Sequence, residues 1–184
     1  MKFAVQGLLI AALAASSLAA VEVEEPSQLI VEVKGIVCSF CAYGARKNLA
    51  RVDFLDRSKF KDGLLMKTER GLITAAIQEG AKADFSQVFK AIGKGGYEIL
   101  AVHVNLVGAP EMQEGKTVLT HAFTRQEFAL VDDQDRPWEA GDFQGKEVSI
   151  QGMVPGAALE GLKGPAVPVQ VKSAKPAEKA GETP

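Results

Sequence analysis

Two cysteines, Cys38 and Cys41, stand two residues apart in this 184-residue chain and are its clearest candidates for chemistry. Thiols at this spacing can bind a soft metal ion as thiolates, exchange electrons as a dithiol/disulfide pair, or form an inert local disulfide. These three uses place different demands on the surrounding elements. The neighbouring sequence therefore has to decide between them.

The cysteines follow a predicted strand and open a predicted helix. Apolar and polar residues alternate over residues 29–34, which is the period of a half-buried strand, and Gly35 ends it. From Ser39 onward, residues four apart share one helix face, namely Cys41, Ala45 and Leu49. The thiols then lie at a helix N-terminus, where the helix dipole favours thiolate formation.

The next seventy residues repeat this alternation of strands and helices. Residues 63–68 and 72–77 have the pattern of a hairpin, with Gly71 in its turn. A second helix is expected to begin at Asp84 and to end at Lys94, before a fourth strand over residues 97–106. This order predicts an α+β fold, a ferredoxin-like βαββαβ domain over residues 28–106.

Residues 28–104 resemble the heavy-metal-associated domain of copper chaperones, metal-pumping ATPases and the periplasmic mercury-binding protein. The resemblance rests on Gly35, Cys38, Cys41 and Ala42 and on the Gly96-Tyr97 pair before the last strand. It implies that Cys38 and Cys41 bind one soft metal ion and that Tyr97 lies near the site. The chain departs from the family at Ile36, where members usually have Met, and in the additional residues 56–62.

Metal binding competes with two other interpretations of the cysteines. Thioredoxin-like proteins also place a Cys-x-x-Cys motif at a helix start, but they have a proline facing it, and this chain has none between Pro26 and Pro110. A structural or idle disulfide needs only an oxidising compartment. A closed zinc site needs four ligands, and His103 and His121 are expected to be surface or satisfied side chains.

The first twenty residues have the order of a signal peptide. Lys2 precedes an apolar run over residues 3–13, too short to span a bilayer, and small residues follow to Ala20. We therefore expect a periplasmic or secreted protein with no membrane association after cleavage. The formal net charge of −2 argues against nucleic acid as a partner.

The second half has the pattern of short strands separated by turns. Residues 107–115 are interpreted as a linker, residues 116–172 as a small all-β domain, and residues 173–184 as a disordered tail. The segment from Gly145 to Val154 resembles strands of the five-stranded oligonucleotide/oligosaccharide-binding (OB) barrel. We find no triad, carboxylate pair or cofactor loop, and therefore expect a protein that is not an enzyme.

The sequence as a whole predicts an exported protein that captures or transfers a soft metal ion. Cu(I) is favoured over Hg(II) and Zn(II), because thiolates are the soft ligands that select it. A metal-donor or metal-acceptor protein is the expected partner. The alternative is a thiol-disulfide redox protein, or a metal-free interaction module with an idle or structural disulfide between Cys38 and Cys41.

Overall fold

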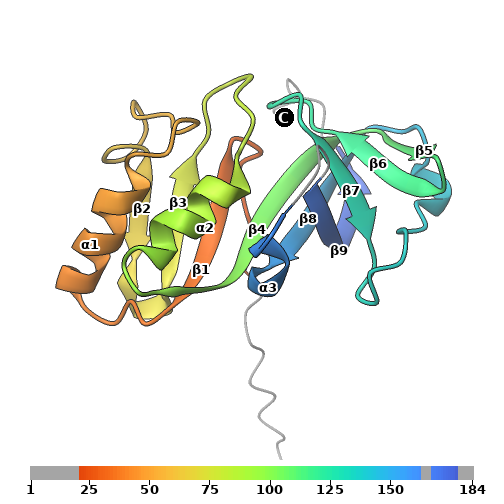
Figure 1. The fold of residues 1–184 in the computed structure, drawn as a ribbon. Coiled ribbons are helices and arrows are strands. Elements are labelled where there is room, and N and C mark those ends of the chain that lie inside the picture. The colour runs from red at the N-terminus through yellow and green to blue at the C-terminus, as the bar shows by residue number, and fades with distance from the viewer. Residues whose placement is uncertain (1–20, 163–166, 178–184) are drawn as a thin grey trace, which may run out of the picture.

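A computed structural model of the chain describes residues 21–162 and 167–177. The described part contains nine strands in a single mixed sheet and three α-helices (Figure 1). In chain order the elements are β1 (Gln28–Lys34), α1 (Ser39–Leu49), β2 (Leu64–Lys67), β3 (Leu72–Ala76), α2 (Phe85–Gly93), β4 (Glu98–Gly108), β5 (Pro110–Gln113), β6 (Lys116–Thr120), β7 (Glu127–Val131), β8 (Val148–Pro155), α3 (Gly156–Leu159) and β9 (Val167–Pro176), with short 3-10 helices at Thr68–Arg70 and Gly141–Phe143.

Several predicted elements form where local signals placed them. β1 alternates buried and less buried residues from Val31 to Lys34, whereas Leu29, Ile30 and Val31 are all buried, and Gly35 follows the strand with a φ of 95°. The side chain of Asp84 caps α2 by accepting hydrogen bonds from the backbone N–H groups of Ser86 and Gln87 at 2.8 and 3.2 Å. Gly71, with a φ of 64°, turns the chain between β2 and β3.

The predicted fold class, a ferredoxin-like domain followed by a separate OB-like barrel, is wrong. The strand order is β2-β3-β1-β4-β8-β9-β7-β6-β5, so one sheet runs through both halves of the chain. The joint is β4, which pairs with β8 in antiparallel register from Ala101 opposite Pro155 to Gly108 opposite Val148. A strand edge that a separate domain would leave open is thereby used to continue the sheet.

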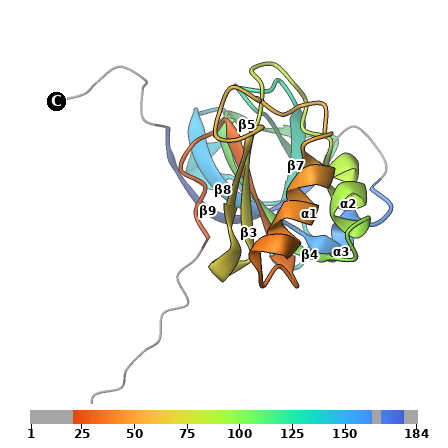
Figure 2. The same ribbon diagram turned by 90° about the vertical axis from the view of Figure 1, so that its left-hand side faces the viewer.

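One hydrophobic core also runs through both halves. A single cluster of buried side chains extends from Leu29 in β1 through the helices to Val169 in β9. The rings of Phe85 in α2 and Phe128 in β7 meet edge to face, with centroids 6.3 Å apart. Figure 2 shows the reason: the sheet curls, and β7 comes round to the side on which α1 and α2 lie.

Of the segments interpreted as signal peptide, linker and tail, the structure describes the linker and the first residues of the tail. Residues 1–20 and 178–184 lie outside the described residues. Within the expected linker, β4 continues to Gly108 and β5 begins at Pro110, while the first residues of the expected tail belong to β9. None of the helices in the described ranges has the length and hydrophobicity needed to cross a membrane.

Candidate functional site

Cys38 forms the N-cap of α1. Its backbone is extended, with φ −146° and ψ 160°, and its Sγ accepts a hydrogen bond from the backbone N–H of Cys41 at 3.1 Å. A sulfur thus takes the place that a Ser, Thr, Asp or Asn oxygen usually has at this position. The first turn of α1 carries no acidic residue, so the positive end of the helix dipole acts on the two thiols without a competing carboxylate on that turn.

Cys41 lies one turn into α1 and is partly exposed, whereas Cys38 is exposed, and both are free thiols. Hydrogen bonding by the Cys38 side chain is the largest cause that lowers the pKa of Cys41 below its ordinary value. Partial burial opposes this effect, and the Tyr97 hydroxyl adds to it. The arrangement therefore favours a thiolate at Cys41, the form that binds metals and attacks disulfides.

Tyr97 comes to the cysteines from the turn before β4. Its hydroxyl donates to the backbone carbonyl of Cys41 at 3.3 Å. Burial, and then the negative charge of Cys41, raises the pKa of Tyr97, which keeps its hydroxyl protonated as a donor. A Cβ on Gly95 would lie 2.6 Å from the Tyr97 ring, so the glycine at this position leaves the ring its space.

Three large apolar side chains that lie next to the cysteines in sequence are exposed to solvent. Val37, Phe40 and Tyr43 are exposed by 85%, 84% and 64%. We call these three residues the apolar collar. The sequence does not reveal this exposure, because the spacing of Phe40 and Tyr43 in α1 is also that of a buried helical stripe. Large apolar side chains that gather around reactive groups are typical of a binding surface.

A groove of about 620 Å³ begins beside the cysteines and follows α1. Its walls include Ser39, Tyr43 and Lys47 of α1, together with Lys61 from the segment before β2. Arg46 ties the two walls together by donating from Nη1 to the carbonyl of Lys61 at 2.8 Å. The additional residues 56–62, noted as a departure from the heavy-metal-associated family, thus help to build a wall next to the candidate site.

The two histidines form hydrogen bonds with other parts of the structure. His103 of β4 bonds to the Glu32 carboxylate with Nε2 and Oε2 3.1 Å apart. His121 is buried, and its ring nitrogens bond to the backbone of Pro26 and Val107. Within the described ranges, no group of three or more His, Cys, Asp or Glu residues is placed to hold a metal ion.

No protein-family model, curated protein or solved structure matches this chain. The resemblance to heavy-metal-associated domains therefore rests on residues 35–42, which we call the cysteine loop, and on the Gly96-Tyr97 pair.

Proposed function

We propose that this protein binds one soft metal ion, Cu(I) in preference to Hg(II) or Zn(II), through the thiolates of Cys38 and Cys41, and passes it on. The observation that carries the proposal is the pairing of both thiols at one helix N-terminus, where the Cys38 Sγ already accepts the Cys41 N–H. Two thiolates suit a two-coordinate soft ion, and a closed zinc site would need more ligands.

Exposure supports transfer more than permanent storage. Cys38 faces solvent, so an incoming thiolate from another protein can reach an ion bound there. The apolar collar gives a donor or acceptor protein an area to contact around the ion. The Tyr97 hydroxyl donates to the Cys41 carbonyl and so helps to fix the backbone at the second thiol. The chain supplies ligands, orientation and access, and no catalytic step is required.

The test is a Cu(I) titration of the reduced protein in competition with a chromophoric chelator. We expect the parent to bind one equivalent and the Cys38→Ser/Cys41→Ser variant to bind none, with both proteins equally folded by circular dichroism. Equal binding by the two proteins would contradict the assignment. Parallel titrations with Hg(II) and Zn(II) test the preference for Cu(I).

The lowered pKa of Cys41 also supports a second function, thiol-disulfide exchange. A reduction potential as oxidising as that of disulfide catalysts, together with insulin reduction, would favour this redox function. A strongly reducing potential without insulin reduction would leave metal binding as the better explanation. Because both assays use the same two cysteines, they are best made on one preparation.

A further inference from the structure

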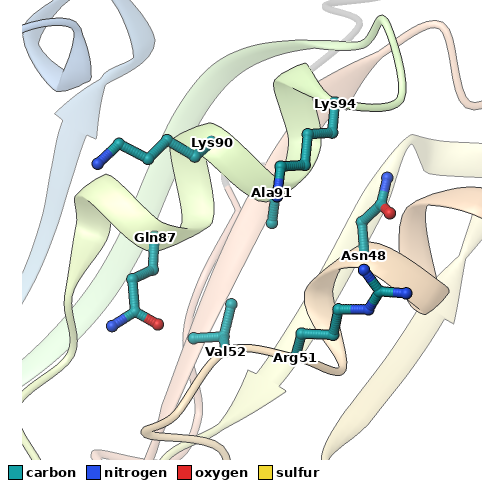
Figure 3. Close-up of a pocket in the computed structure, with 7 residues that line it drawn as sticks. All are labelled: Asn48, Arg51, Val52, Gln87, Lys90, Ala91 and Lys94. Carbon is teal, nitrogen blue, oxygen red and sulfur yellow. The ribbon is translucent and has the colours of Figure 1, made fainter.

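A second hollow lies between α1 and α2 (Figure 3) and does not include the cysteines. Its volume is about 190 Å³, smaller than the roughly 300 Å³ at which pockets for drug-sized ligands begin. Val52 and Ala91 give it buried apolar walls. The remaining lining residues are polar: Asn48, Arg51, Gln87, Lys90 and Lys94. A hollow of this size would accept a single chemical group.

Every polar residue that lines the hollow can donate hydrogen bonds, and none is a carboxylate. Among the described residues, no carboxylate lies within ion-pair distance of Arg51, Lys90 or Lys94. In Figure 3 these three cationic side chains point in different directions. Lys94 lies back over Ala91 and Arg51 rises from α1 beside Asn48, whereas Lys90 extends away from α1.

Arg51 is not needed to neutralise the partial negative charge at the C-terminal end of α1. Another residue, Arg57, donates from Nη2 to carbonyls at and just beyond that end, Ala50 at 3.1 Å and Val52 at 3.3 Å. The nearby carboxylate of Asp53 accepts a hydrogen bond from the Gln87 amide at 3.3 Å and is not part of the lining. The guanidinium of Arg51 and the ammonium of Lys94 thus remain without a partner in the described part of the chain.

We propose that this hollow binds a phosphoryl oxyanion, either inorganic phosphate or the phosphate group of a larger molecule. Arg51 from one helix and Lys94 from the other would hold it, and the Asn48 amide would donate a further hydrogen bond. The guanidinium fork matches phosphate oxygens in a bidentate way, and Lys94 adds a point charge from the opposite wall. Two cations on facing helices favour a dianion over a monoanion.

Phosphate binding is measured on the full chain by following backbone amide NMR shifts of α1 and α2. We expect saturable binding that Arg51→Gln and Lys94→Gln each weaken by about tenfold or more, the loss of one charge-assisted contact. The matched control is Lys82→Gln, which removes the same charge from an exposed lysine just before α2 that does not line the hollow. Its affinity should stay within about twofold of the parent.

Two results would overturn the proposal: absence of saturation in the parent, or an equal loss in the Lys82→Gln control, which would mean unspecific attraction to charge. Acetate should bind at least about tenfold more weakly than phosphate, and equal affinity would contradict the choice of a dianion. Tighter binding of glycerol phosphate than of phosphate would support a phosphorylated ligand, and the reverse would support the free ion. The Cys38→Ser/Cys41→Ser variant should bind phosphate as the parent does, which separates this test from that of the metal site.

Discussion

The cysteine loop and the junction between β4 and β8 use polar and apolar residues in opposite ways. At the junction, polar side chains are buried and satisfied: the Ser149 hydroxyl donates to Asn105 Oδ1 at 2.8 Å, and Asn105 reaches the carbonyl of Glu24. At the cysteine loop, Phe40 is 84% exposed next to free thiols. The junction has the features of a region that holds the fold, and the loop those of a surface that meets other molecules.

A close approach of two backbone segments lies at the end of the junction. A Cβ on Gly156, which starts α3 directly after β8, would lie 1.8 Å from the carbonyl oxygen of Ile99 in β4. Gly156→Ala should therefore force the two segments apart and lower the free energy of unfolding by about 3 kcal/mol. Chemical denaturation measures this loss. Gly93→Ala is the control, because nothing lies within 4 Å of its added Cβ, and it should be neutral or stabilising by up to about 1 kcal/mol. A Gly156→Ala protein as stable as the control would show that the backbone at the junction can shift to accept the added methyl group without loss of stability.

Gln151 is one of the side chains that hold the segment before β1 to the junction. Gln151 accepts from the backbone N–H of Val23 at 3.1 Å and donates to its carbonyl at 2.9 Å, and Val23 is fully buried. Gln151→Leu leaves both backbone groups without partners and should cost about 2 kcal/mol. Gln170→Leu on the neighbouring strand β9 is the matched control. Its amide makes exposed contacts only, so its cost should stay within about 0.5 kcal/mol. Equal losses of unfolding free energy in the two variants, measured by chemical denaturation, would mean that the contacts of Gln151 with Val23 stabilise the fold no more than the exposed contacts of Gln170.

The cysteine loop should behave in the opposite way. Phe40→Ser removes a large apolar side chain that is 84% exposed, so the free energy of unfolding should change by no more than about 0.5 kcal/mol. Ile36→Ser, four residues earlier and 3% exposed, should cost about 3 kcal/mol. A large loss of stability in Phe40→Ser would mean that the apolar collar belongs to the core.

The sequence predicts features that depend on neighbouring residues, and it does not predict features that depend on the pairing of distant segments. Local signals located β1, the start of α1 and the cap at Asp84, because each depends on residues within one turn or one strand. The closeness of Tyr97 to the cysteine loop came from the element order and the family resemblance, and the 3.3 Å bond to Cys41 agrees with it.

The pairing of β4 with β8 could not be predicted in this way. Both segments have the alternation expected of strands, but alternation does not identify the partner strand. The same limit applies to the hollow between the helices, since Arg51 and Lys94 are brought together only by the packing of α1 on α2. The exposure of Phe40 was also out of reach, because helical spacing does not say which stripe is buried.

The smallest predicted effect concerns the two thiols themselves. Since hydrogen bonding by Cys38 is the largest cause of the lowered pKa of Cys41, Cys38→Ala should raise the pKa of Cys41 and delay thiolate formation to higher pH. The measurement is the rate of Cys41 alkylation by iodoacetamide as a function of pH, because only the thiolate reacts. Cys38→Ser keeps a hydroxyl at the N-cap that can donate to the thiolate, so its pKa should rise less. A pKa that is unchanged in Cys38→Ala would mean that the helix terminus alone activates Cys41. The two thiols would then be neighbours that act independently, which would weaken the case for a site built as a pair.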